Sequence, residues 1–395
     1  MWKRGGRGYE VVSSTNAVPR RIVRLSTDRD RLIPLRRTEA FLSKDLDLPE
    51  GFSWYAIVGQ PRPSNFTPPA GSVAIFLPED FHYLGDGDVV RLDQDNGEIT
   101  ALFQEAARHN SFLLTERCNN YCLMCSQPPK DVQDDWIVKD IMDAVPLINR
   151  ETQGIVLTGG EPTLLGDRLV SLVRQFKSYL PFTGVHVLTN GRAFTDLDYA
   201  KKFTAVDHSD LMFGIPIYSD IPDIHDYVVQ ADGAFDETVR GVLNLKRAGL
   251  KVEIRVVIHK QTYARLPELA RFLARNLTFV DQVVLMGLEI TGFTRANLDS
   301  LWIDPLEYQP QLLEAVKILE ANRMTVAVYN HQLCITDKEL WRFAKQSISD
   351  WKNEYMPECE GCSVKKDCAG FFSSAKIRYS DHIKPILTQF LPVFK

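Results

Sequence analysis

The chain has 395 residues, of which 45% are hydrophobic and 25% charged, and its formal net charge is -5 at pH 7. A chain of this length can bury one large core and still carry further modules, so we expect two or three structural units. The slight acidic excess offers no basic surface for nucleic acid, and neither a signal peptide nor an apolar run of about 18 residues is present, so we expect a cytoplasmic protein that binds neither nucleic acid nor membrane.

The first part of the chain, residues 1–108, is expected to form a small β-rich domain. Short β-type runs alternate with turns rich in Gly, Pro, Asp and Asn, and they lie at 54–58, 73–77, 89–92 and 99–103. The turn Asp95-Asn96-Gly97 is a typical hairpin signal between the last two runs. This segment contains no cysteine, and we expect it to dock a substrate or partner.

From residue 109 the pattern changes to alternating strands and helices. Strands are expected at 111–115, 153–158, 184–189, 211–217, 252–258 and 283–288, and a further strand at 325–329 is expected to extend the barrel edge. Helices are expected at 134–150, 164–179, 196–203, 236–248, 266–276 and 305–323. This alternation predicts an α/β fold of parallel strands with right-handed crossovers, which over 109–323 corresponds to a partial (β/α)6 TIM-type barrel with functional groups at the C-terminal ends of the strands.

Three cysteines directly follow the first barrel strand. Cys118, Cys122 and Cys125 lie within eight residues, so one loop can place three thiolates around one object. A 4Fe-4S cluster has four irons, and three thiolates would leave one iron open as a reaction site. Two alternatives remain, because the thiols could belong to a structural zinc site or could simply be buried.

A second motif follows the second barrel strand. Gly159 and Gly160 allow a close backbone approach to a ligand, Glu161 offers a carboxylate to an ammonium group, and Pro162 directs the following chain. Taken alone, these four residues could be an ordinary turn into a helix. Their position one strand after the cysteines favours a shared site.

Together, the Cys-x3-Cys-x2-Cys loop and the Gly-Gly-Glu-Pro turn resemble the motifs of the radical S-adenosylmethionine (SAM) superfamily. The resemblance implies that Cys118, Cys122 and Cys125 hold a 4Fe-4S cluster whose open iron binds the amino and carboxylate groups of SAM. It also implies that the Gly159–Pro162 turn binds the SAM amino group. The residue before the third cysteine is commonly aromatic in this superfamily and packs near the adenine, whereas here it is Met124, which can fill the same apolar space.

Three further strand ends contribute candidate cofactor-binding residues. Asn190 follows the third strand, and the resemblance implies that Ser219 contacts the SAM ribose and Arg255 the SAM carboxylate. The alternatives are a turn cap for Asn190 and Ser219 and a solvated strand residue for Arg255. Residues 224–236 look like the loop after the fourth strand in peptide-modifying members, with Asp236 as a helix cap.

A second cysteine group lies in the C-terminal segment, residues 324–395. Cys359, Cys362 and Cys368 form a compact array that Cys334 would complete to four thiolates, which suits either zinc or a second iron-sulfur cluster. The position after the barrel resembles the SPASM or twitch extension, which holds an auxiliary 4Fe-4S cluster. For Cys334 the alternative is a buried thiol.

The sequence around both cysteine groups also resembles the C-type maturase of the His-Xaa-Ser system. That resemblance implies a precursor with His-Xaa-Ser repeats, a second radical SAM maturase, and a reductant such as flavodoxin or ferredoxin. We therefore expect a radical SAM enzyme that cleaves SAM reductively to a 5′-deoxyadenosyl radical, which abstracts hydrogen from a ribosomally made peptide. The alternatives are a radical SAM enzyme acting on a small molecule and a non-catalytic zinc scaffold. No catalytic acid or base is assigned, since His259 and His331 are more simply packing or surface residues.

Overall fold

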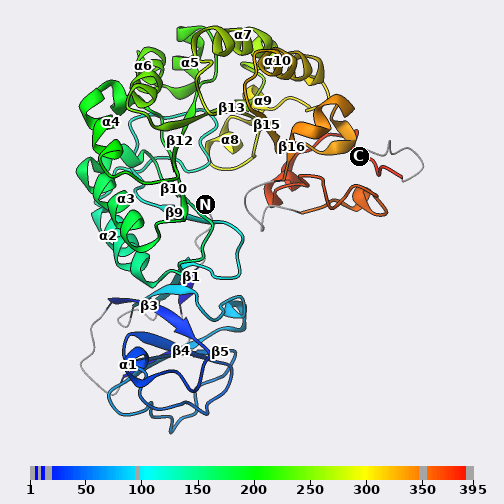
Figure 1. Cartoon of the computed structure of the whole chain (residues 1–395). Helices are drawn as coiled ribbons and strands as arrows, with labels where there is room; N and C mark the ends of the chain where they lie inside the picture. Colours follow the sequence, from blue (N-terminus) through cyan, green and yellow to red (C-terminus); the bar gives the residue numbers. More distant parts are fainter. Residues whose placement is uncertain (1–4, 8–9, 14–19, 94–97, 347–353, 388–395) are drawn as a thin grey trace. The chain divides into compact units, whose positions relative to one another are not determined.

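The computed structural model describes residues 5–7, 10–13, 20–93, 98–346 and 354–387 (Figure 1). The described residues form two sheets of eight strands each, one in the N-terminal part of the chain and one parallel sheet with helices between its strands. This confirms the predicted fold class, an α/β partial barrel preceded by a β-rich segment. In the part of the chain that is described, no helix is long and apolar enough to cross a membrane.

The N-terminal sheet has the strand order β1-β8-β7-β3-β4-β5-β6-β2. The four predicted strands correspond to β5–β8, and their antiparallel β7–β8 pair agrees with the expected hairpin, whose turn lies outside the described residues. Strands β1–β4 were not predicted. The bounds are β1 Gly5–Arg7, β2 Glu10–Ser13, β3 Arg20–Ser26, β4 Glu39–Ser43, β5 Trp54–Val58, β6 Val73–Leu77, β7 Val89–Asp93 and β8 Glu98–Phe103.

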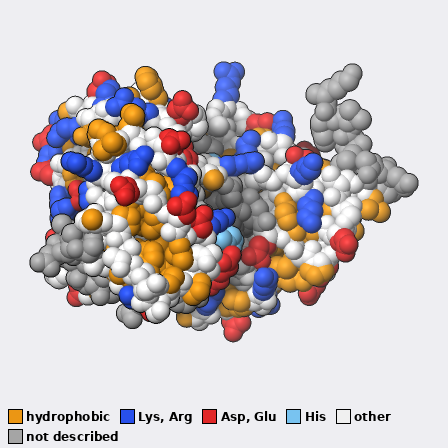
Figure 2. Space-filling model, turned by 90° about the horizontal axis from the view of Figure 1, so that it is seen from below, with side chains coloured by type: hydrophobic (Ala, Val, Ile, Leu, Met, Phe, Trp, Pro, Cys, Tyr) orange, Lys and Arg blue, Asp and Glu red, His pale blue; other side chains and the backbone are white. Residues whose placement is uncertain are grey.

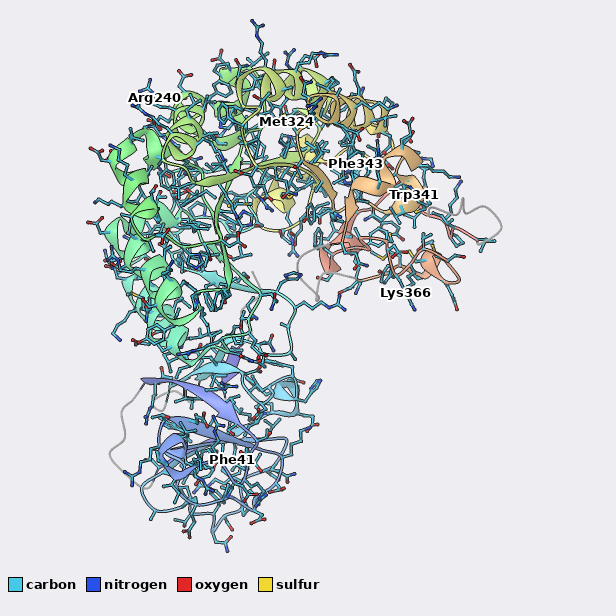
Figure 3. All side chains as sticks on the ribbon, in the orientation of Figure 1. Phe41, Arg240, Met324, Trp341, Phe343 and Lys366 are labelled. Carbon is cyan, nitrogen blue, oxygen red and sulfur yellow. The ribbon has the colours of Figure 1, made fainter. Side chains whose placement is uncertain are left out.

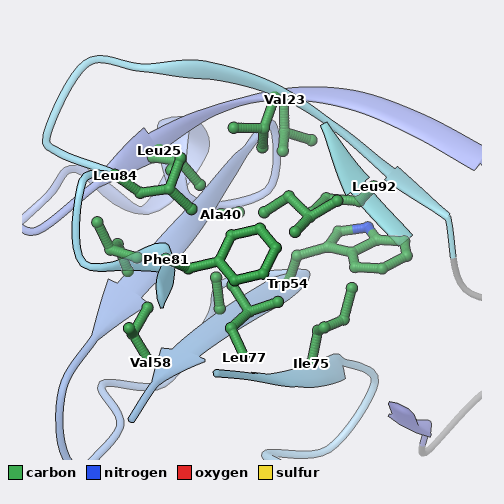
Figure 4. Packing of buried hydrophobic residues seen from close by; sticks show 14 of the residues in the cluster. Val23, Leu25, Ala40, Trp54, Val58, Ile75, Leu77, Phe81, Leu84 and Leu92 are labelled. Carbon is green, nitrogen blue, oxygen red and sulfur yellow. The ribbon is translucent and has the colours of Figure 1, made fainter. Parts of the chain in front are cut away.

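The two edges of this sheet belong to strands that are neighbours in sequence. Arg7 ends β1 and Glu10 begins β2, and three residue steps span at most roughly 11 Å, so the sheet must curl until its edges approach each other. Its inner face is a core that includes Trp54, Leu77 and Phe81 (Figure 4). The alternate residues of β5, Tyr55 and Ile57, pack in a second cluster on the other face, which explains why all five residues of β5 are buried.

The second sheet has the order β16-β15-β14-β13-β12-β11-β10-β9, and every pair from β11 to β16 is parallel. Its strands are β9 Asn110–Leu113, β10 Gly154–Thr158, β11 Gly184–Leu188, β12 Leu211–Pro216, β13 Lys251–Ile258, β14 Gln282–Gly287, β15 Val326–Tyr329 and β16 Ala344–Lys345. The first six lie where the sequence predicted the six barrel strands, and β15 lies where it predicted the further edge strand. The sheet then continues through β15 and β16, so the barrel has two strands more than six units would give.

Helices connect these strands and cover the outer side of the sheet, as α4, α6, α7 and α10 do along β12–β15 in Figure 1. Their bounds are α2 Asp135–Ala144, α3 Asp167–Tyr179, α4 Leu197–Thr204, α5 Pro222–Val229, α6 Ala234–Arg247, α7 Leu266–Asn276 and α10 Gln309–Ala321. Three short helices complete the set, α1 Ile33–Arg36, α8 Phe293–Ala296 and α9 Leu298–Leu301.

The expectation for the segment after the fourth strand was wrong in two respects. Part of the expected loop is helix α5, which begins with Pro222 at a position where a missing backbone N–H costs nothing. Helix α6 begins at Ala234, so Asp236 lies in its first turn and is not its cap. Instead, the Asp226 carboxylate accepts hydrogen bonds from the backbone N–H groups of Gly233 at 2.6 Å and Phe235 at 2.7 Å.

The described chain divides into two compact units. Unit 1 comprises residues 1–114, 134–155 and 171–183, and unit 2 comprises residues 115–133, 156–170 and 184–395. Both cysteine groups and all the candidate cofactor residues belong to unit 2. Acidic and basic side chains are interspersed on the face shown in Figure 2, as the small net charge leads one to expect.

Candidate cluster and cofactor site

The loop that carries Cys118, Cys122 and Cys125 is held along one side by the segment that follows β14. Asn297 donates from Nδ2 to the Leu123 carbonyl at 2.9 Å, and Thr294 donates from Oγ1 to the Met124 carbonyl at 3.2 Å. The Phe293 N–H donates to the Cys125 carbonyl at 2.8 Å. Gly292 precedes it with φ +52°, and a Cβ there would lie 2.2 Å from the Cys125 carbonyl oxygen. The loop therefore takes its shape from residues that follow it by about 170 positions.

Helix α5 and the end of β11 hold the other side of the same loop. The backbone N–H groups of Tyr121 and Leu123 donate to the carbonyls of Val229 and Val228, at 3.0 Å and 2.9 Å. Arg192 donates to the carbonyl of Asn119 at 3.0 Å and to Oδ1 of Asn120 at 2.6 Å. These contacts hold the stretch from residue 119 to residue 123.

The three thiols are partly buried and electrostatically coupled to one another. Burial is the main cause that raises the pKa of Cys118 to about 12, and the nearby charges of Glu161 and Cys125 contribute in the same direction. A hydrogen bond from the Asn120 N–H at 3.4 Å acts in the opposite direction. Burial is also the main cause that raises the pKa values of Cys122 and Cys125. Buried thiols become thiolates only with a nearby positive charge, which metal coordination supplies.

Among the described residues, no three His, Cys, Asp or Glu side chains lie close enough together to hold a single metal ion. A 4Fe-4S cluster takes each thiolate on a different iron, so its ligands do not converge on one atom. Three soft sulfur donors on one rigid loop fit such a cluster. The assignment of Cys118, Cys122 and Cys125 as its ligands stays a prediction.

The Gly-Gly-Glu turn packs directly against the start of the cysteine loop. The Gly160 N–H donates to the Thr115 carbonyl and the Glu161 N–H to the Arg117 carbonyl, both at 2.7 Å. A Cβ on Gly160 would lie 2.0 Å from the Arg117 carbonyl oxygen, and one on Gly159 would lie 2.7 Å from that of Thr115. Glycine is therefore needed at both positions because the backbone of the cysteine loop packs against them. The sequence predicted glycine there for a different reason, the close approach of a ligand.

Glu161 is buried, with 1% of its surface exposed, and its carboxylate is held by donors from two strand ends. Its Oε1 accepts from the Thr163 N–H at 2.9 Å and from the hydroxyls of Thr163 and Thr189 at 2.6 Å each. Its Oε2 accepts from the Asn190 N–H at 2.7 Å. Among the described residues, no Lys, Arg or His is within ion-pair distance of this carboxylate, and the remaining acceptor capacity is on Oε2. Such a group fits the predicted contact with an ammonium.

Asn190 and Ser219 both make the turn contacts that were weighed as alternatives. Asn190 accepts from the Arg192 N–H at 3.1 Å, and it also donates to Oδ1 of Asn119 in the cysteine loop at 2.7 Å. The Ser219 hydroxyl accepts from the Ile221 N–H at 3.1 Å. Pro162 is the first residue of the 3₁₀ turn that Glu161 caps. Their roles toward SAM stay predictions.

Arg255 is not the solvated strand residue that was weighed as its alternative role. Its side chain is 21% exposed and forms an ion pair with the buried Glu253 at 2.5 Å, and it donates to the Met286 sulfur at 3.2 Å. His186 lies 3.7 Å from the same Glu253 oxygen. Gly214 makes room for this group, because a Cβ there would lie 2.8 Å from His186 Nε2 and 3.0 Å from Arg255 Cδ.

Met124 and the histidines occupy buried positions. Met124 packs in an apolar cluster with Tyr218 and Leu301, and Cys122 borders that cluster. His331 is in contact with Tyr308 through Nε2 at 2.9 Å and with the Tyr329 carbonyl through Nδ1 at 2.8 Å. His259 is fully buried. Burial lowers the pKa of each histidine to about 4, so both are neutral at pH 7 and packed in the core.

The four C-terminal thiols gather on two adjoining apolar clusters. Cys334 and Cys359 pack with Met356 and Phe371 in one cluster. Cys362 and Cys368 pack with Leu333, Val364 and Trp341 in the other, and Trp341 is labelled in Figure 3. Burial raises the pKa of Cys334, and the charges of Cys368 and Cys359 raise it further. The predicted fourth member is thus close to the array that it was expected to complete.

Two of these sulfurs accept backbone hydrogen bonds. The Leu333 N–H donates to Cys368 and the Ile386 N–H donates to Cys362, each at 3.4 Å. Hydrogen bonds of this kind stabilise thiolate ligands and tune the potential of iron-sulfur clusters. No three of these thiols, all of which are among the described residues, are close enough to hold a single ion, so their arrangement fits a second cluster better than zinc, and the auxiliary cluster stays a prediction.

Several residues that shape the site were not predicted. Asn119, Asn120, Thr189 and Arg192 act through contacts between strand ends that lie far apart in the sequence. The only local sequence signal for these contacts was the pair Asn119-Asn120 between Cys118 and Cys122. Arg192 also forms an ion pair with Glu237 of α6, so the loop is connected to that helix as well.

Comparison with known families identifies the central part of the chain. Residues 112–273 match the family model described as the radical SAM superfamily. This segment begins within β9 and ends within α7, and it contains the first cysteine group and every candidate SAM-binding residue. Over these residues the match confirms the predicted likeness to the radical SAM superfamily.

Two curated relatives and one solved structure are similar to this chain. "Probable GTP 3',8-cyclase" of Sulfurisphaera tokodaii is 25% identical over 210 residues, which are 52% of this chain and 62% of that protein. "Mycofactocin maturase MftC" of Mycolicibacterium smegmatis is 31% identical over 168 residues, 41% of this chain and 40% of that protein. The crystal structure of Streptococcus suis SuiB bound to S-adenosylmethionine gives a TM-score of 0.45 at 16% identity, covering 58% of this chain and 53% of SuiB. The chain thus spans less than two thirds of each relative.

Proposed function

We propose that the chain is a radical SAM enzyme, and that it is a maturase that modifies a ribosomally made peptide or protein. When bound and reduced, the cluster on Cys118, Cys122 and Cys125 supplies the electron that splits SAM into methionine and a 5′-deoxyadenosyl radical, which takes hydrogen from the substrate. The chain's own residues bind and orient the reactants and exclude water.

One observation carries the assignment of the site. Gly160 and Glu161 hydrogen-bond to Thr115 and Arg117, directly before Cys118, so the predicted cluster ligand and the predicted ammonium acceptor are parts of one rigid unit. Glu161 is buried next to Cys118 closely enough to raise the pKa of that thiol. A carboxylate fixed at this place can hold the SAM amino group while the loop holds the cluster.

The roles of the remaining predicted residues follow from their positions. Gly159, Gly160, Glu161 and Pro162 form the turn for the amino group. Asn190 positions Glu161 and the cysteine loop together, since it contacts both. We assign Ser219 to the ribose and Arg255 to the SAM carboxylate, where Arg255 would exchange part of its contact with Glu253 for the ligand.

For Cys334, Cys359, Cys362 and Cys368 we propose an auxiliary 4Fe-4S cluster. Four thiolates complete its coordination, so it would relay electrons or stabilise the fold and would not bind substrate through an open iron. The resemblance to the C-type His-Xaa-Ser maturase makes a His-Xaa-Ser precursor the proposed substrate. Flavodoxin or ferredoxin as reductant, and a second radical SAM maturase as partner, belong to the same proposal.

The first test is anaerobic purification with iron and sulfide analysis. We expect about eight irons per chain, and about four in the variant Cys118→Ala/Cys122→Ala/Cys125→Ala. Reduction in the presence of SAM should give 5′-deoxyadenosine from the wild type alone. About four irons plus about one zinc would make the C-terminal site structural, and a chain without iron or deoxyadenosine would overturn the proposal in favour of a zinc scaffold.

The second test addresses the substrate. A peptide with His-Xaa-Ser repeats, incubated with the reduced enzyme and SAM, should change in mass, and the triple cysteine variant should leave it unchanged. Similarity to a GTP 3′,8-cyclase supports the alternative of a small-molecule substrate. Consumption of GTP with deoxyadenosine formation, together with an unchanged peptide, would establish that alternative.

A further inference from the structure

A cavity in unit 2 lies between the surroundings of the two cysteine groups. One wall comes from Leu288 after β14, and Leu288 also packs in the apolar cluster that Cys122 borders. Another wall comes from Phe371, which packs in the cluster with Cys334 and Cys359. A ligand in this cavity would therefore contact residues next to both groups.

In the described part of the chain, the cavity combines apolar walls with one unsatisfied polar group, the hydroxyl of Ser374. Ser374 lines it and is 6% exposed, and its hydroxyl has no hydrogen-bond partner among the described residues. A buried hydroxyl without a partner is costly, which indicates that a ligand or water satisfies it. Asn330 and Gln332 also line the cavity and use their side-chain N–H groups for the Gly287 and Gly370 carbonyls.

The charge of the cavity has one sign. Among the described residues that line it, Arg378 is the only charged one, and none of them is Asp or Glu. Its guanidinium lies 3.9 Å from the centre of the Trp302 ring, which orients it by a cation–π contact. No carboxylate of the described residues forms an ion pair with Arg378. An oriented guanidinium beside an apolar pocket is suited to a carboxylate, which it can bind through two parallel hydrogen bonds.

We propose that this cavity binds a segment of the peptide substrate in which an acidic side chain neighbours a large apolar one. The carboxylate binds Arg378, the apolar side chain packs against Leu288 and Phe371, and the Ser374 hydroxyl bonds a peptide group. This inference rests on the proposed peptide substrate and adds a sequence preference to it. Arg378 is thus a specificity-determining residue outside the SAM site.

Binding of two labelled peptides tests the preference directly. The probes are fluorescein-labelled Gly-Ser-Phe-Asp-Gly-Ser and the same peptide with Asn for Asp, titrated with the anaerobic full-length protein. We expect the wild type to bind the Asp peptide about tenfold more tightly, the magnitude of one charge-assisted contact. Arg378→Gln should abolish this difference in affinity. Ser374→Ala should weaken the binding of both peptides by a similar factor.

Lys376→Gln is the matched control. It removes the same charge two residues away, where Lys376 is exposed and paired with Glu354, and it should keep the wild-type preference. Equal affinity of the wild type for both peptides, or a preference that survives in Arg378→Gln, would overturn the proposal. If GTP binds in an Arg378-dependent manner and neither peptide binds, the proposed peptide ligand is wrong and the cavity binds a small anionic ligand.

A parallel assay separates this inference from the proposed function. Reduced enzyme and SAM without any peptide report SAM cleavage, and the wild type and the control Lys376→Gln should form 5′-deoxyadenosine at the same rate. A peptide preference without deoxyadenosine would refute the radical SAM activity and leave the binding site standing. Deoxyadenosine without a peptide preference would refute the binding site alone.

Discussion

The Glu161 carboxylate accepts a hydrogen bond from the backbone N–H of Asn190 at 2.7 Å, which joins the ends of two neighbouring barrel strands. Asn190 in turn donates to Asn119 in the cysteine loop. One buried carboxylate thus fixes the relative positions of the second strand end, the third strand end and the loop. A substitution at Glu161 should therefore disturb the positions of both strand ends and of the cysteine loop.

Glu161→Gln should destabilise the fold as well as weaken SAM binding. An amide in place of the carboxylate puts N–H donors against the donors of Asn190 or of Thr163 and Thr189, and a mismatched buried bond costs about 1–3 kcal/mol. The midpoint of chemical denaturation reports the loss. The control Glu237→Gln removes a more exposed carboxylate that pairs with Arg192 and should have a smaller effect. Equal midpoints for Glu161→Gln and the wild type would contradict the description of this group.

Gly160→Ala should reduce the iron bound at the first cysteine group. The added Cβ would lie 2.0 Å from the Arg117 carbonyl oxygen, so the backbone next to Cys118 would have to move. Iron analysis after anaerobic purification should show a loss of up to about four irons per chain. Gly85→Ala is a suitable control, because nothing lies within 4 Å of a Cβ there. Full iron content in Gly160→Ala would show that the loop tolerates the displacement.

Arg255→Gln should destabilise the chain more than the double variant Arg255→Gln/Glu253→Gln. The single change leaves the buried Glu253 carboxylate without its cation, whereas the double change removes both charges. For a partly exposed pair we expect a difference of about 1–2 kcal/mol in the free energy of unfolding. If the double variant recovers stability but forms no deoxyadenosine, Arg255 also acts on SAM. If the double variant recovers both stability and deoxyadenosine formation, the role of Arg255 is limited to its ion pair with Glu253.

His259→Leu should make the chain more resistant to mild acid. Burial lowers the pKa of His259 to about 4, so as pH falls from 6.5 the unfolded chain takes up a proton that the folded chain does not. Stability is therefore lost between about pH 6.5 and pH 4, by at most about 3 kcal/mol for this group. Melting of the cluster-free chain from pH 7.5 to 4.5 should show a shallower decline for His259→Leu, whereas the exposed His82→Gln should follow the wild type. Parallel curves for His259→Leu and the wild type would contradict this explanation.

The sequence identified the parts of the site whose chemistry is local. Cys118, Cys122 and Cys125 are recognisable because their spacing is set within one loop, and Glu161 because two glycines and a proline flank it. Six barrel strands were placed to within two residues, since their apolar runs are bounded by clear turns.

Contacts between distant strand ends could not be read in the same way. The partners of Glu161 beyond Thr163 lie 28 and 29 residues away, and the bond from Arg192 to Asn120 spans 72 residues. Strand β3 was missed because three arginines interrupt its apolar alternation. The ion pair of Arg255 with Glu253 was not predicted, although residues two positions apart on a strand lie on the same face of the sheet.

The contacts of the cysteine loop also set an order of events in the making of this protein. Asn297, Thr294 and Phe293 shape the loop, yet the ribosome adds them about 170 residues after the cysteines. A nascent chain that ends before Asn297 has all three thiols but lacks the scaffold that positions them. Insertion of a cluster into its final geometry must therefore wait until most of the barrel has been synthesised and folded, and until then the thiols depend on the cell for protection from oxidation.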